Sequence, residues 1–138
     1  MYLLDTNVIS ELRKATSNKI NPKVKRWAET IAPSSMFLSV ITVLEIEQGI
    51  LQVARRDKKQ AQTLKKWLMQ VILPVFEDRI LAIDVPVALR YAALHVPNPA
   101  SERDALIAAS AIEHRLALVT RNTQDFDAKQ LKLINPWN

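Results

Sequence analysis

The side chains in this sequence whose positions could support chemistry are carboxylates. They are Asp5, Glu45, Asp104 and Asp125. Asp5 and Asp125 come after apolar runs, Glu45 lies in the helix that follows one, and Asp104 lies at the start of a helical pattern. Hard oxygen ligands without histidine or cysteine suit Mg²⁺ or Mn²⁺. If three of these acids gather at one edge of a sheet, their repulsion favours a bound cation. A carboxylate-bound Mg²⁺ commonly acts on phosphate esters, so the pattern indicates phosphodiester hydrolysis.

The composition removes several competing chemistries. The 138 residues contain one glycine, two histidines and no cysteine. Glycine loops that bind dinucleotides or phosphates need at least two glycines, and without cysteine there is no disulfide, thiolate zinc site or cysteine nucleophile. His95 and His114 lie too far apart for an H-E-x-x-H metal helix, and a Ser-His-Asp triad is possible only through one of them.

Each acid also has a structural explanation. Asp5 could cap the first helix, Asp104 could belong to a capping box begun by Ser101, and Asp125 could shape a turn. Glu45 lies opposite the apolar arc of its helix, so it faces either solvent or an open cleft. For each residue taken alone, the structural explanation is the simpler one. Four acids gathered at one site would instead favour metal-assisted hydrolysis.

Short apolar runs alternate with helical patterns along the chain. Strands are predicted at 2–4, 36–39, 80–83, 116–119 and 131–134. The first helix is predicted around 8–12 with Thr6 or Asn7 as its cap, and later helices at 22–31, 40–55, from Asp57 to Pro74, at 84–95 and after 101. This alternation predicts one α/β domain over residues 1–138, with a central parallel sheet of four to five strands flanked by helices. The residues that follow such strands gather at one edge of the sheet, here Asp5, Ser39, Asp84, Thr120, Asn122 and Asp125.

The net charge of +5 is uneven along the chain. Residues 1–70 hold twelve Lys and Arg against six Asp and Glu, whereas residues 71–138 hold seven against eight. A basic half suggests an anionic partner, most commonly nucleic acid. The basic side chains of 55–66 are equally explained as the solvated face of one helix. Because no apolar run approaches the ~18 residues of a membrane span, and no secretory leader is evident, we expect a cytoplasmic protein without a membrane partner.

Four segments follow one another in an order and spacing that match a known family. They are YLLDTNVISEL at 2–12, LSVITVLEI at 38–46, DALIAA at 104–109 and LVTRNTQDF at 118–126, and the chain closes on NPW at 135–137. The sequence resembles the PIN-domain ribonucleases, and within them the VapC/FitB-like toxins of type II toxin–antitoxin systems. The resemblance covers essentially the full length, so it implies a PIN-like fold.

The resemblance implies roles for individual residues. Asp5 and Asp104 would hold Mg²⁺, or Mn²⁺, most directly, while Glu45 and Asp125 would complete the acidic pocket through waters or a second cation. Polar positions that line the pocket match Thr6, Thr120 and Asn122. The implied reaction is endonucleolytic hydrolysis of RNA by a metal-activated water, which leaves 5′-phosphate and 3′-hydroxyl ends.

The resemblance also implies protein partners. Toxins of this kind form homodimers and sometimes higher assemblies with an antitoxin encoded beside them. The antitoxin's tail covers the groove and often places a basic side chain among the acids.

Two other functions remain open from the sequence. The chain could be a non-catalytic RNA-binding or assembly module of the same fold, although such modules usually lose acids. It could also be a phosphohydrolase of the haloacid dehalogenase type, which begins with an acid after its first strand. That chemistry requires a second Asp where this chain has Asn7.

Overall fold

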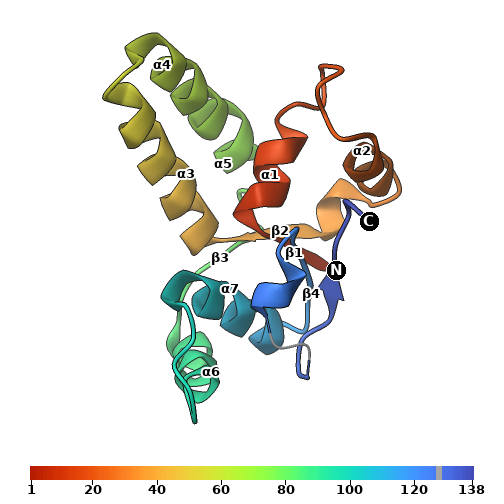
Figure 1. The fold of residues 1–138 in the computed structure, drawn as a ribbon, viewed down its shortest axis with the longest axis vertical. Coiled ribbons are helices and arrows are strands. Elements are labelled where there is room, and N and C mark those ends of the chain that lie inside the picture. Colours follow the sequence, from red (N-terminus) through yellow and green to blue (C-terminus); the bar gives the residue numbers. More distant parts are fainter. Residues whose placement is uncertain (127–128) are drawn as a thin grey trace.

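A parallel β-sheet forms the centre of the molecule (Figure 1). The structure is a computed structural model, and it describes residues 1–126 and 129–138. Within them, five strands pair in the order β3-β2-β1-β4-β5, namely Tyr2–Leu4 (β1), Met36–Ser39 (β2), Ile80–Leu81 (β3), Ala117–Val119 (β4) and Leu133–Ile134 (β5). All four pairings are parallel. The predicted α/β class is therefore confirmed.

The central strands are buried on both faces. Because successive side chains of a strand point to opposite faces, a strand of consecutive apolar residues needs cover on each side. Leu3 and Leu118 pack with Ile107 in one cluster, whereas Leu4 and Val119 belong to the other. The site residues are thus attached to strand ends that both layers hold in place.

Helices form the two covering layers (Figure 1). One side carries Thr6–Leu12 (α1), Pro22–Glu29 (α2), Val40–Ala54 (α3), Lys58–Trp67 (α4) and Leu73–Val75 (α5), and the other carries Val85–Leu94 (α6) and Glu102–Glu113 (α7). The helices α3 and α4 form a hairpin that projects away from the sheet. Among the described residues, no helix combines the length and apolar character needed to cross a membrane.

Several boundaries differ from the sequence prediction. The first helix is capped by Asp5, not by Thr6 or Asn7, because the chain is already helical at Thr6. Pro74 does not end its helix: a π-helical turn at Leu68–Ile72 leads into α5, whose first turn accepts a proline because N–H groups there need no helical partner. The strands predicted at 80–83 and 131–134 shorten to two residues each, since both lie at sheet edges and pair with one neighbour.

Candidate active site

Four different elements carry the four acids. Asp5 follows β1, Glu45 lies in the second turn of α3, Asp104 in the first turn of α7, and Asp125 ends a short 3₁₀ turn at Thr123–Asp125 after β4. Burial is the largest cause that raises the pKa of Asp104, followed by the negative charges of Asp5, Asp125 and Glu45. The fold therefore brings the other three carboxylates within electrostatic reach of Asp104.

Asp84 also follows a strand, but its role is structural. Its carboxylate accepts a hydrogen bond from the backbone N–H of Val87 at 3.1 Å and caps α6. Its charge is not among those that raise the pKa of Asp104.

Asp5 is the most rigidly held of the four acids. Only 6% of its surface is exposed. Its Oδ1 accepts the backbone N–H of Thr6 at 2.8 Å, and its Oδ2 accepts the hydroxyl of Thr120 at 2.8 Å. The Thr120 oxygen in turn accepts the backbone N–H of Asn122 at 3.1 Å, which leaves its own hydrogen directed at Asp5. Asp5 thus caps α1, as its structural explanation requires, and is oriented by the end of β4 as well.

Asn7 is a site residue that sequence reasoning missed. Its Nδ2 lies 3.5 Å from Asp5 Oδ2 and 3.5 Å from Thr120 Oγ1. Its Oδ1 accepts the backbone N–H of Arg121 at 3.3 Å. The side chain therefore ties the turn after β1 to the turn after β4. The available signal was its position two residues after Asp5, where it was considered as a helix cap or as the place of a second acid.

Glu45 faces the cleft. Its Oε1 accepts the hydroxyl of Thr6 at 2.6 Å, so the residue next to Asp5 also positions this second acid. Its Oε2 lies 3.9 Å from the guanidinium of Arg103, which also donates to Gln48 at 2.7 Å. Arg103 was likewise missed, although it directly precedes Asp104 in the sequence.

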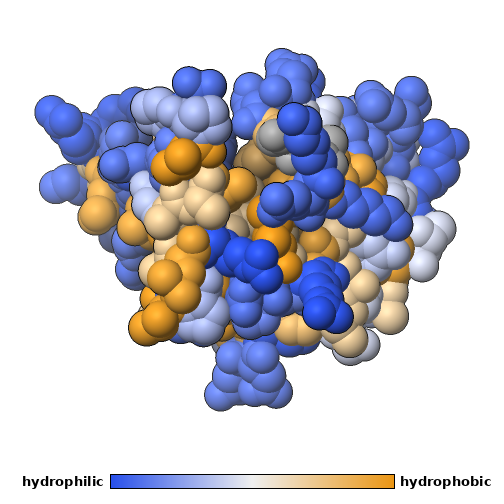
Figure 2. Space-filling view, turned by 90° about the horizontal axis from the view of Figure 1, so that it is seen from below, coloured by the Kyte–Doolittle hydropathy of each residue, from blue (hydrophilic) through white to orange (hydrophobic). Residues whose placement is uncertain are grey.

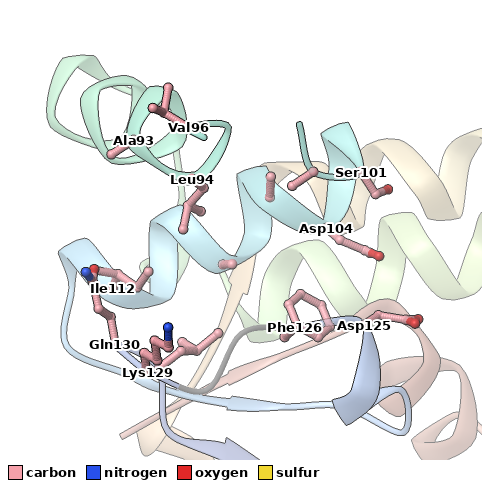
Figure 3. Close-up of a pocket in the computed structure, with 14 residues that line it drawn as sticks. Ala93, Leu94, Val96, Ser101, Asp104, Ile112, Asp125, Phe126, Lys129 and Gln130 are labelled. Atoms are coloured by element: carbon pink, nitrogen blue, oxygen red, sulfur yellow. The ribbon is translucent and has the colours of Figure 1, made fainter. Parts of the chain in front are cut away.

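Ser101 occupies the N-cap position of α7, but its hydroxyl makes no capping hydrogen bond. The capping-box explanation of Asp104 is therefore wrong. Asp104 is half-buried, and its carboxylate lies at one end of a pocket together with that of Asp125 (Figure 3).

Two hollows adjoin the acids, and three of the four acids line one or the other. The first has a volume of about 240 Å³ and includes Asp104 and Asp125 in its wall (Figure 3). The second has a volume of about 260 Å³ and is lined by Glu45, Ile50 and Trp67, among others. A ligand can therefore approach the acids from two directions.

The four acids fit a divalent cation in donor chemistry and charge. They are oxygen donors, which Mg²⁺ and Mn²⁺ prefer, and a cation would relieve the repulsion that raises the pKa of Asp104. Within residues 1–126 and 129–138, however, no three Asp, Glu, His or Cys side chains are grouped tightly enough to hold a metal ion. The hydroxyls of Thr120 and Thr6 hold Asp5 and Glu45 in their own hydrogen bonds. Metal binding therefore requires the acids to move closer together, while each hydrogen-bonded carboxylate oxygen keeps a further lone pair for a cation.

The basic segment at 55–66 covers the turn after α3 and the exposed face of α4. Its Lys and Arg side chains are exposed, and Lys65 forms an ion pair with Glu47 of α3. This pair also explains why a carboxylate stands in the apolar arc of α3: it faces the neighbouring helix of the hairpin.

The chain is similar to known proteins in both sequence and fold. Residues 2–130 match the PIN domain family. Toxin FitB of Neisseria gonorrhoeae is 37% identical over 100% of this chain and 99% of its own length, and VapC ribonuclease Y4jK of Sinorhizobium fredii is 34% identical over 99% and 98%. The crystal structure of FitAcB from Neisseria gonorrhoeae has a TM-score of 0.86 at 37% identity, covering 100% of this chain and 99% of that chain. A toxin–antitoxin complex from Klebsiella pneumoniae has a TM-score of 0.70 at 29% identity, with coverage of 100% and 99%.

Proposed function

The chain belongs to the PIN-domain family, and on that premise we propose that residues 1–138 form one metal-dependent endoribonuclease domain, the toxin of a toxin–antitoxin pair. The feature that supports the proposal is the convergence of Asp5, Glu45, Asp104 and Asp125 from four elements, near enough that the other three charges raise the pKa of Asp104. The relative named as a VapC ribonuclease supports the reaction, and the relative named Toxin FitB supports the biological role.

In this proposal Asp5 and Asp104 hold Mg²⁺, with Mn²⁺ as an alternative, and Glu45 and Asp125 complete the acidic site. A bound Mg²⁺ supplies Lewis acidity toward a phosphoryl oxygen and lowers the pKa of a water molecule for in-line attack. Asp5 is prepared for this role because a backbone N–H and a hydroxyl already fix both of its oxygens. Asp104 contributes a carboxylate whose raised pKa disfavours its ionised form, and a bound cation would favour that form.

The neighbouring polar residues position the acids. Thr6 orients Glu45, while Thr120 orients Asp5 and is itself held by the backbone N–H of Asn122. Groups that orient metal ligands in this way commonly change affinity or activity by about 10- to 100-fold when removed. Arg103 adds a partly exposed positive charge beside Glu45, where it can meet a phosphate of the substrate.

A comparison of two substrates tests the proposed reaction. The purified chain with Mg²⁺ should cut RNA and should leave p-nitrophenyl phosphate at its background rate. Rapid release of p-nitrophenol with intact RNA would instead support the haloacid dehalogenase type of phosphohydrolase. Binding of RNA without metal-dependent cutting would support a non-catalytic module.

We also propose a homodimer formed through the first turns of α3 and α6. Val85 and Leu89, one turn apart on α6, are 72% and 69% exposed, and Val40 and Leu44 of α3 are also exposed. Because β2 and β3 are neighbours, the helices that follow them begin at the same sheet edge. Figure 2, seen from the side of α6, shows apolar side chains gathered in patches among hydrophilic ones.

Leu89→Glu should weaken this dimer at least about tenfold, because it would bury an unpaired charge in an apolar contact. Light scattering over a concentration series measures the change in mass. The matched control is Met69→Glu, which places the same charge at another exposed apolar position. Equal masses for both variants and the wild type would contradict the assignment of this face.

An antitoxin is the second proposed partner. The structural relative described as a toxin–antitoxin complex supports such a partner. In this proposal the antitoxin binds in the hollow between α3 and α4, which has apolar walls at Ile50 and Trp67. Glu45, one of the four acids, lines the same hollow. These features suit a peptide that carries an apolar side chain followed by a basic one.

A further inference from the structure

The pocket of about 240 Å³ beside Asp104 and Asp125 has a composition unlike that of the acidic site. Its lining is mainly apolar, with Ala105 and Ala108 of α7, Leu94 and Phe126, and it also includes the charged Lys129. In Figure 3 the two carboxylates lie together at one end, and the ring of Phe126 lies on the pocket side of both. An apolar hollow therefore opens directly from the charged centre.

We propose that this hollow, called the base pocket here, receives one unpaired nucleobase of the RNA next to the phosphate that is cut. The proposal rests on the proposed ribonuclease function and adds a substrate-binding subsite to it. It makes Phe126 the stacking surface, with Ser101 at the end near the acids and Gln130 at the opposite end as the polar groups available to the base (Figure 3).

The size and lining of the pocket match a single base. Drug-sized ligands occupy clefts of about 300 to 1,000 Å³, so a volume of about 240 Å³ suits a smaller, flat group. Alanines in the lining keep the space open where larger side chains would fill it. Unpaired bases bind proteins by stacking on aromatic rings and by hydrogen bonds to their edges, and the pocket offers both kinds of group.

The position of the pocket favours RNA over a protein segment as its occupant. Asp104 and Asp125 belong both to the pocket and to the acidic site. A phosphate held at the acids by a cation would place an adjoining base at the pocket entrance. The base is also the uncharged and flat part of a nucleotide, so the apolar walls can accept it without burying charge.

Four variants and two substrates test the base pocket. Ser101→Trp narrows the pocket from an exposed position whose hydroxyl caps nothing, and Phe126→Leu removes the ring while keeping an apolar side chain in the core. Glu102→Trp is the matched control, since Glu102 is exposed, adjoins Ser101 and does not line the pocket. Gln130→Ala removes the edge contact. Each protein is assayed on intact RNA and on the same RNA with an abasic ribose on either side of the cut.

For the wild type, loss of one flanking base should lower kcat/KM by about 5- to 100-fold, the range expected for one base–aromatic stack. Ser101→Trp and Phe126→Leu should lower kcat/KM for intact RNA by a similar factor and should no longer distinguish intact from abasic RNA. Gln130→Ala should change the preference among bases. Glu102→Trp should behave as the wild type does.

Several outcomes would overturn the base pocket. Equal cutting of intact and abasic RNA by the wild type would do so, as would an undiminished abasic penalty in Ser101→Trp and Phe126→Leu. If Ser101→Trp leaves RNA cutting intact but abolishes binding of the partner protein, the pocket belongs to that protein. Failure of the wild type and of Glu102→Trp to cut any RNA would instead overturn the ribonuclease proposal itself.

Discussion

Asp104→Asn should lower Mg²⁺-dependent cleavage of RNA at least about 100-fold, because it removes a negative charge from the proposed metal site while keeping the shape of the side chain. Cleavage of a fluorescently labelled RNA under single-turnover conditions measures the loss. Asp84→Asn is the matched control: it makes the same chemical change at a residue that caps α6, where Asn caps as well as Asp.

The same variant should not lose stability at neutral pH when divalent cations are absent. Since the folded-state pKa of Asp104 is raised, the stability linked to this group is fully present below its ordinary pKa of 3.8. That stability is lost as the pH rises through the raised value. The neutral Asn avoids the loss, so at about pH 7 its thermal midpoint should equal or exceed that of the wild type, and the difference should close in acid.

Thermal melts of Asp104→Asn and the wild type in chelator, at neutral and at acidic pH, measure this difference in midpoint. A large drop in the midpoint of Asp104→Asn at neutral pH would mean that the carboxylate serves the fold, and the loss of cleavage would then have a structural cause. Intact folding with full cleavage would remove Asp104 from the mechanism altogether.

Gly49→Phe should weaken binding of the antitoxin by at least about 30-fold, the effect of a typical interface hot spot. Gly49 lines the hollow between α3 and α4, and a Cβ built on it meets no atom within 4 Å. A bulky side chain at this position can therefore fill the hollow proposed to bind the antitoxin, without disturbing the core. Replacing a helix-interior glycine also removes its unfavourable helix propensity.

Co-expression with the protein encoded by the adjacent gene, followed by affinity measurement on the purified pair, tests this expectation. Leu51→Phe is the control, because Leu51 is exposed and two residues along α3 place it on the far side of the helix. Nuclease activity of the free Gly49→Phe chain should remain. Undiminished binding by Gly49→Phe would place the antitoxin elsewhere.

The elements of the fold were predictable because they depend on local patterns. Apolar runs such as 2–4 and 117–119 must be buried on both faces, and the acids that follow them must then share a sheet edge. Asp5, Glu45 and Asp125 follow predicted strands or lie in the helix after one, so they could be selected on that ground, whereas Asp104 was selected from the start of a helical pattern. The cap of α1 was placed one or two residues late, since Asp5, Thr6 and Asn7 all have side chains that can cap a helix.

Other features of the site depend on contacts between distant segments. Asn7 meets Thr120, 113 residues away, and Arg103 meets Gln48, 55 residues away. No local spacing encodes either contact. The base pocket likewise combines α6, α7 and the residues around Phe126, so its apolar lining was indistinguishable from core in the sequence. Pro74 was misread because a π-helical turn before it is a departure that helical periodicity does not reveal.

The chemical nature of the RNA ends tests the central claim most directly, that the four carboxylates hydrolyse RNA through a divalent cation. RNA cut by the purified chain with Mg²⁺ should carry 5′-phosphate and 3′-hydroxyl ends. Cutting should survive a single 2′-deoxy substitution at the cleaved nucleotide and should stop when the cation is chelated. Cyclic phosphate ends or loss of cutting on 2′-deoxy substitution would contradict the account, because the nucleophile would then be the 2′-hydroxyl of the RNA and not water. Full activity in chelator would also contradict it, because no divalent cation would then be required.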